Sequence, residues 1–136
     1  MSFELQAHTA DIGISADGND LEEVFEQIAE GLAAAMLDTI PADGERYPIA
    51  VCAESREALL FDYLDELIYQ RDVLAVLPVD HDVSVDTRDG MWQLEGSFRG
   101  VPARGLGGRE IKAVTYADMR LEATEDGWIA YVVFDV

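Results

Sequence analysis

Two Asp-Gly dipeptides in the second half of the chain constrain its fold more than any other feature. Each dipeptide separates two segments in which apolar and polar residues alternate: 81–87 and 91–99 flank Asp89-Gly90, and 111–123 and 128–135 flank Asp126-Gly127. Asp-Gly between alternating segments is the strongest short-range sign of a β-hairpin, because both residues tolerate the positive φ of a tight turn. The second half of the chain is therefore predicted to form two successive antiparallel hairpins.

The first half of the chain predicts two amphipathic helices separated by strands. Apolar residues recur every three or four positions in a stretch that ends near Leu37, and again over roughly 56–71. Asn19, followed by Glu22, is the expected N-cap of the first helix, and Ser55 that of the second. The remaining apolar segments are three short strands and one further stretch: 3–7, 11–16, 47–53 and 73–77.

The order of these elements predicts an α+β fold with two helices and a mainly antiparallel sheet, and it argues against a doubly wound nucleotide-binding fold. At 136 residues the chain has the length of one domain, which is predicted to span residues 1–136. Hydrophobic residues make up 49% of the chain, and this share excludes wholesale disorder.

The start of the chain and its cysteine content favour a cytoplasmic protein. Residues 1–5 have neither the basic region nor the apolar stretch of a signal peptide. No segment approaches the roughly 20 apolar residues of a membrane helix. Cys52 is the single cysteine, so it cannot form an internal disulfide, and its apolar neighbours predict a place in the core. A cytoplasmic location without membrane contact is expected.

The net charge of −19 is extreme, because 28 acidic residues face nine basic ones and Lys112 is the single lysine. Self-repulsion of this size opposes a compact state at low salt, whereas at about 1 M salt the screening length falls to about 3 Å. The composition therefore indicates a halophile-like adaptation to a salty cytoplasm. The alternative is an acidic patch that meets a basic partner. With either explanation, stable direct binding to nucleic acid is not expected.

Two aspartates at opposite ends of the chain are the strongest functional candidates. Asp11 and Asp135 each stand in a stretch typical of a buried strand, where an isolated carboxylate is costly unless something compensates it. One explanation is structural: Asp11 caps a turn before Gly13, and Asp135 lies at a frayed end. The other is a shared divalent cation, to which the terminal carboxylate of Val136 would add oxygen ligands. Such ligands suit Ca²⁺ or Mg²⁺, while two histidines and one cysteine disfavour zinc.

A basic, glycine-rich segment over residues 99–112 is the second candidate, since it holds four of the nine basic residues. Arg104, Arg109 and Lys112 are candidates for contacting an anionic group or a partner. Alternatively, the segment is a connection whose arginines meet neighbouring acids. His8 either contributes at the rim of the metal site or is a hydrogen-bonded structural residue. No serine elbow or Ser-His-Asp set is apparent, so nucleophilic catalysis has little support and no catalytic residue is assigned.

Five motifs, taken in order along the chain, resemble the archease family. They are HTADIGI from His8, LEEVFE from Leu21, LLFDYLDEL from Leu59, IKAVTY from Ile111, and the closing Phe134-Asp135-Val136. The resemblance covers nearly the whole chain and implies a small α+β fold related to the strand-helix-strand-strand module. Many members of the family carry histidine where Ala117 stands here.

The resemblance also implies a metal site, usually described with calcium, formed by Asp11, Asp135 and Val136, with Lys112 as the motif lysine. It implies an accessory protein that assists an RtcB-type RNA ligase in tRNA splicing by promoting ligase guanylylation and multiple turnover. Two other functions stay open. One is a chaperone or specificity modulator of other RNA-modifying enzymes, and the other is a metal-dependent hydrolase that uses Asp11 and Asp135.

Overall fold

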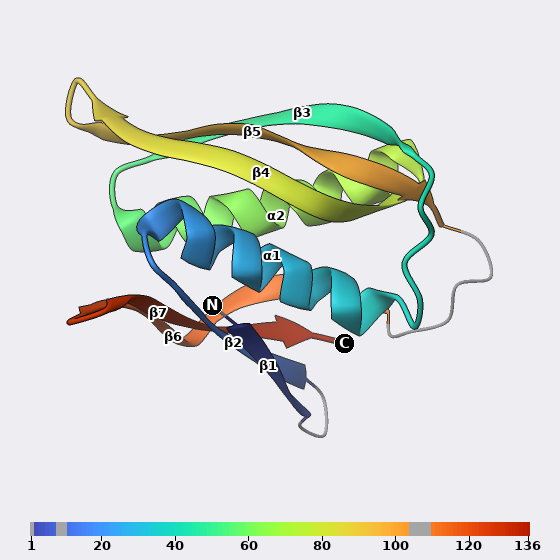
Figure 1. Cartoon of the computed structure of the whole chain (residues 1–136), viewed down its shortest axis with the longest axis horizontal. Coiled ribbons are helices and arrows are strands. Elements are labelled where there is room, and N and C mark those ends of the chain that lie inside the picture. The colour runs from blue at the N-terminus through green and yellow to red at the C-terminus, as the bar shows by residue number, and fades with distance from the viewer. Residues whose placement is uncertain (1, 8–10, 104–109) are drawn as a thin grey trace.

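Alternating burial along the strands places the core between two sheets, and both helices lie in the space between them (Figure 1). This computed structural model describes residues 2–7, 11–103 and 110–136. The elements are β1 (Ser2–Ala7), β2 (Asp11–Gly18), α1 (Leu21–Met36), β3 (Glu45–Ala53), α2 (Arg56–Leu74), β4 (Val76–Arg88), β5 (Met91–Pro102), β6 (Ala113–Thr124) and β7 (Gly127–Asp135).

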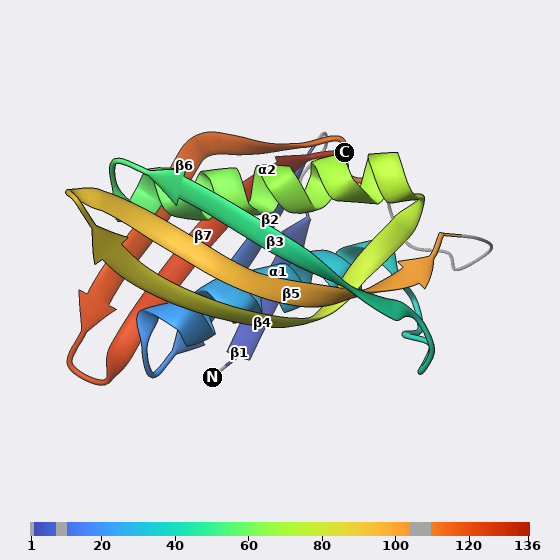
Figure 2. The same ribbon diagram turned by 90° about the horizontal axis from the view of Figure 1, so that it is seen from above.

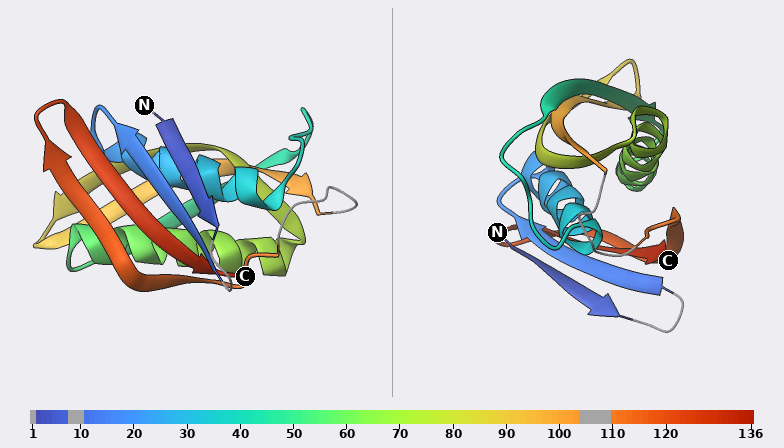
Figure 3. Two further views of the ribbon diagram at one scale, coloured as in Figure 1. Left: turned by 90° about the horizontal axis from the view of Figure 1, so that it is seen from below. Right: turned by 90° about the vertical axis from the view of Figure 1, so that its right-hand side faces the viewer.

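One sheet has the order β1-β2-β7-β6 and the other the order β3-β5-β4. Every pairing among these strands is antiparallel, which confirms the predicted α+β class with antiparallel pairing. The strands of the two sheets cross when seen from above (Figure 2). An end-on view shows the helices as a middle layer, with α2 and the chain end on the same side of the molecule (Figure 3, right). None of the described helices is long and apolar enough to cross a membrane.

The helix starts are set by side-chain caps. Asp20, rather than the predicted Asn19, caps α1, because its backbone is extended and its Oδ1 accepts a 2.8 Å bond from the Glu23 amide. The Asn19 amide instead donates to Glu23 Oε1 at 3.4 Å. Ser55 caps α2 as predicted, with a 3.1 Å bond from the Ala58 amide.

The boundary between α2 and β4 differs from the prediction. The helix continues to Leu74, and Ala75 ends it in the left-handed region, with a φ of 56°. The stretch 73–77 is therefore divided between the end of α2 and the start of β4, which begins at Val76. Apolar character was common to both elements, so the hydrophobic pattern alone did not reveal the break.

Both predicted hairpins are present, but their turns differ. Asp89 and Gly90 form the first turn, with φ values of 53° and 80°. In the second hairpin Thr124 pairs with Gly127, so Glu125 and Asp126 form the turn. Gly127 is required for another reason: a Cβ there would collide with the Gly18 carbonyl oxygen.

Cys52 is exposed, so the prediction of a core cysteine was wrong. Ile49 and Ala53 point into the core from β3, and strand alternation turns Cys52 to the outer face.

β4 is an edge strand of its sheet, and carboxylates of α1 lie along its free side. Glu22 accepts a 3.0 Å bond from the Val85 amide, and Glu26 accepts a 2.9 Å bond from the Val83 amide. Glu30, one further turn along the helix, places its carboxylate 3.6 Å from His81 Nε2. Unpaired edge amides invite pairing with other chains, and Glu22 and Glu26 satisfy two of these amides within the fold.

Candidate functional site

The pairing of β2 with β7 brings Asp11 directly opposite Asp135. The neighbouring pair, Ile12 and Phe134, is 2% and 0% exposed and points into the core. Because successive side chains alternate between the two faces of a sheet, both aspartates point to the outer face, where directly opposed Cβ atoms lie about 4.5–5.5 Å apart. The two acids that the sequence singled out from opposite ends of the chain are therefore adjacent.

One carboxylate oxygen of Asp11, Oδ1, is buried and is left without a hydrogen-bond partner in the described part of the chain. A buried carboxylate oxygen without a partner is costly, and like charges directly opposed across two strands are destabilising. A divalent cation with oxygen ligands would remove both penalties. These residues thus fit Ca²⁺ or Mg²⁺.

Lys112 and Val136 lie beside this pair. The Lys112 amide donates a 2.8 Å hydrogen bond to the Asp135 carbonyl, while the Lys112 side chain is on the exposed surface. Val136, which follows Asp135 directly, packs against the main core. Ile111, the residue before Lys112, is fully buried and so anchors this segment in the core.

The other predicted site residues are not located. His8, Arg104 and Arg109 lie outside the described residues. Of the basic segment 99–112, residues 104–109 are not described. Within residues 2–7, 11–103 and 110–136, no group of three or more His, Cys, Asp or Glu side chains is arranged to hold a metal. A site at Asp11 and Asp135 would therefore draw its further ligands from Val136, from the main chain, from water or from the partner.

Two features near the site were missed from sequence. Tyr131 lies over Gly13, where any Cβ would collide with its ring. A glycine inside a strand pattern signals such a close approach. Arg71 of α2 donates a 2.6 Å bond to the Ile111 carbonyl and so ties the helix to the segment just before β6, which carries Lys112. No local sequence pattern signals that contact.

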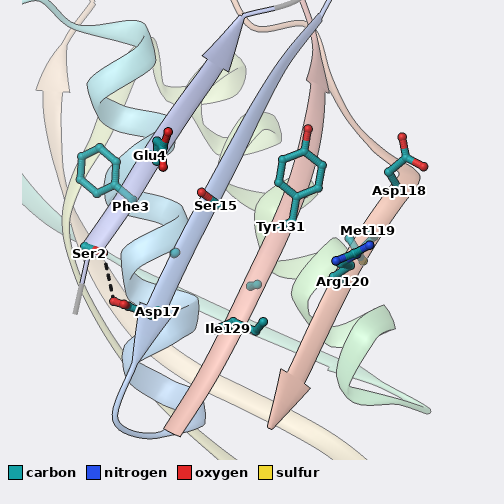
Figure 4. A pocket seen from close by; sticks show the side chains of 12 residues that line it. Ser2, Phe3, Glu4, Ser15, Asp17, Asp118, Met119, Arg120, Ile129 and Tyr131 are labelled. Atoms are coloured by element: carbon teal, nitrogen blue, oxygen red, sulfur yellow. Dashed lines mark hydrogen bonds between the residues drawn. The ribbon is translucent and has the colours of Figure 1, made fainter. Parts of the chain in front are cut away.

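The outer face of this sheet also holds an open groove of about 800 Å³. Across it runs a row of side chains, one from each strand, shown in Figure 4: Glu4, Ser15, Tyr131 and Arg120. Acidic and basic groups are mixed in this row, so the groove has no single charge preference. The paired aspartates lie outside this groove. Asp11 is the first residue of β2, and Asp135 is the last residue of β7.

Comparison with known proteins identifies the family. The model described as the Archease protein family matches residues 3–136. The chain belongs to the archease family. It is 35% identical over 139 residues to the archease of Pyrococcus furiosus, covering 98% of each chain. It is 37% identical over 138 residues to that of Methanothermobacter thermautotrophicus, again covering 98% of each.

Two solved structures support the fold of this archease. The solution structure of Methanobacterium thermoautotrophicum protein 1598 has a TM-score of 0.86 at 33% identity and covers 99% of both chains. The crystal structure of an archease from Thermotoga maritima, described as a possible chaperone, has a TM-score of 0.65 at 25% identity, covering 96% of this chain and 94% of that one.

Proposed function

We propose that this archease activates an RtcB-type RNA ligase in tRNA splicing and promotes its guanylylation and multiple turnover. The observation that supports this most is the pairing of Asp11 with Asp135 at the ends of β2 and β7, where Asp11 Oδ1 is buried and has no hydrogen-bond partner among the described residues. Two acids in such a place are unfavourable for the isolated fold, so a function that uses their charge accounts for them.

In this proposal Asp11 and Asp135, with main-chain or terminal oxygens of Val136, hold a divalent cation at the nucleotide pocket of the ligase. Such an ion offsets phosphate charge in phosphoryl transfer. The strands β2 and β7 orient the two carboxylates, and Val136, which follows Asp135 directly, packs against the core. The exposed Lys112 contacts the ligase or a phosphate group. The chain itself carries no catalytic nucleophile in this scheme and acts as an accessory protein.

The test is stimulation of ligase guanylylation by purified Asp11→Ala and Asp135→Ala variants. Each is expected to lose at least tenfold in stimulation while keeping its fold. Asp86→Asn, an exposed strand carboxylate of the other sheet, is the matched control and should stimulate like the wild type. Full stimulation by the folded Asp11 and Asp135 variants would refute the metal-site mechanism.

A C-terminal extension separates two versions of the site. Adding a few residues after Val136 should reduce stimulation if the terminal carboxylate is a ligand. Stimulation should be unchanged if the side chain of Asp135 suffices.

The second candidate is a chaperone or specificity modulator of other RNA-modifying enzymes, favoured by the description of the Thermotoga maritima relative as a possible chaperone. It predicts that the protein prevents aggregation of unrelated enzymes and that Asp11→Ala retains this effect. A metal-dependent hydrolase would instead turn over model phosphoesters without any ligase.

A further inference from the structure

The outward face of α2 carries exposed apolar side chains among its charged ones. The inward face contributes six buried residues: Leu59, Leu60, Tyr63, Leu64, Leu67 and Ile68. On the opposite side, Tyr69 and Val73 are each 60% exposed. They stand four residues apart and so are neighbours on the helix surface. Both faces of α2 therefore carry apolar side chains, although only one is covered by the fold.

A further exposed aromatic side chain lies where α2 meets β6. Phe61 of α2 stacks on Tyr116 with ring centroids 4.0 Å apart and planes 4° from parallel, and Tyr116 remains 56% exposed. Phe61 and Val73 are about 18 Å apart along the helix axis. Tyr69 and Tyr116 together expose on the order of 200 Å² of side chain. We call the set Phe61, Tyr69, Val73 and Tyr116 the α2 stripe.

Acidic residues stand within the α2 stripe. Asp62 and Asp65 lie between Phe61 and Tyr69 on the outward side of the helix, and Asp72 is largely exposed although it pairs with Arg71. Partial burial and the neighbouring Asp65 raise the pKa of Asp62, which indicates that these carboxylates repel one another. A surface of apolar anchors interrupted by carboxylates complements a surface of apolar and basic side chains.

The helix that carries the α2 stripe is tied, through the inward-pointing side chain of Arg71, to the segment that holds Lys112. Arg71 bonds the Ile111 carbonyl at 2.6 Å, and the next residue, Lys112, bonds the Asp135 carbonyl at 2.8 Å. Figure 3 shows α2 and the chain end on one side of the molecule, with α1 on the other. A partner seated on the stripe would therefore lie on the side of the molecule where the chain ends.

We infer that the α2 stripe is the surface on which the ligase docks, and that the ligase contacts it with apolar side chains flanked by lysine or arginine. This inference rests on the proposed function and adds a partner surface to it. A nucleic acid is disfavoured because Asp62 and Asp65 would face its phosphates. A second copy of this chain is disfavoured because two faces with the same acids, on molecules of net charge −19, would repel each other.

The test measures binding to a purified RtcB-type ligase by titration calorimetry and guanylylation in parallel. Tyr69→Ser/Val73→Ser removes two exposed anchors without touching the core. It is expected to raise the Kd at least tenfold while stimulation recovers at saturating concentration. The matched control is Ile40→Ser/Ile129→Ser, two positions that are 52% and 38% exposed elsewhere on the surface, and its Kd should stay within twofold of wild type.

Asp65→Lys tests the chemistry of the partner. It should weaken binding, and it should reduce the salt dependence of the Kd. Stronger binding by Asp65→Lys would mean an acidic partner surface and would overturn the assignment.

Failure of this inference is distinguishable from failure of the proposed function. Wild-type binding by Tyr69→Ser/Val73→Ser, with normal stimulation, would overturn the docking surface alone. A wild-type chain that neither binds nor stimulates the ligase would overturn both. Self-association of the wild type that Tyr69→Ser/Val73→Ser abolishes would assign the stripe to a homodimer and overturn docking of the ligase.

Discussion

Acid should unfold this protein partly through one buried histidine. The His81 side chain is 1% exposed, and neither ring nitrogen has a hydrogen-bond partner among the described residues. The ring centroids of Tyr63 and Phe98 each lie 6.4 Å from the centroid of the His81 ring. Burial disfavours the charged imidazolium and lowers the pKa of His81 from 6.5 to about 4.

The sign and size of the effect follow from this difference in pKa. The unfolded chain binds a proton at His81 as the pH falls through 6.5, whereas the folded chain does so only near pH 4. Stability from this residue is therefore present above pH 6.5 and is lost as the pH falls toward 4. At about 1.36 kcal/mol per pH unit, the loss is about 2 kcal/mol at pH 5 and about 3 kcal/mol at pH 4.

Neighbouring groups modify the effect without reversing it. The Glu30 carboxylate lies 3.6 Å from His81 Nε2, but burial raises the pKa of Glu30, so it neutralises early as the pH falls. The nearby Pro78 backbone carbonyl and Asp80 favour the imidazolium and Arg46 opposes it, each less strongly than burial. The raised pKa values of Glu26 and Glu30 act in the opposite direction, since protonation of these carboxyls favours the fold. A variant is therefore needed to isolate His81.

His81→Phe keeps an aromatic ring between Tyr63 and Phe98 and removes the titrating group. The free energy of unfolding of the variant, relative to wild type, should rise by about 2 kcal/mol between pH 7 and pH 5. Urea unfolding followed by tryptophan fluorescence at constant high salt measures it. His8→Phe, which removes the other histidine of the chain, is the control. A difference between His81→Phe and wild type that stays constant over this range would refute the reasoning.

Three further predictions concern packing and charge. Gly13→Ala should cost about 1–3 kcal/mol, because its Cβ would displace the Tyr131 ring. Thermal unfolding should show a smaller cost in a Tyr131→Ala background, and equal costs would contradict the contact. Arg56 lies 5.6 Å from the Trp92 ring and 5.0 Å from the Trp128 ring, so Arg56→Leu should cost about 1 kcal/mol in urea unfolding; an unchanged midpoint would exclude the cation–π contribution. Lowering KCl from about 1 M to about 0.1 M should reduce the thermal midpoint, since screening of the net charge of −19 is lost, and a midpoint independent of salt would contradict the halophile-like interpretation.

Local sequence patterns predicted the helices and strands because each element has its own hydrophobic periodicity and is bounded by cap or turn residues. Asp89-Gly90 and the Ser55 cap were placed correctly, since their backbone geometry depends on adjacent residues alone. The Asn19 prediction was wrong by one residue, because Asn19 and Asp20 are both good caps and only the fold selects between them.

The sheet order could not be predicted in this way. The register of Asp11 against Asp135 follows from the alternation of Ile12 and Phe134 once β2 and β7 are neighbours. That they are neighbours depends on how strands from opposite ends of the chain assemble. The charge of the two aspartates was visible in sequence, whereas their adjacency and the burial of Asp11 Oδ1 required the fold.

Direct titration with Ca²⁺ or Mg²⁺ in about 1 M KCl tests the central claim, because high salt suppresses diffuse binding to an acidic surface. Wild type should bind one equivalent of Ca²⁺ or Mg²⁺, and Asp11→Asn and Asp135→Asn should each lose that binding, while Asp86→Asn keeps it. Equal affinity in wild type, Asp11→Asn and Asp135→Asn would contradict the claim that these two aspartates hold the ion.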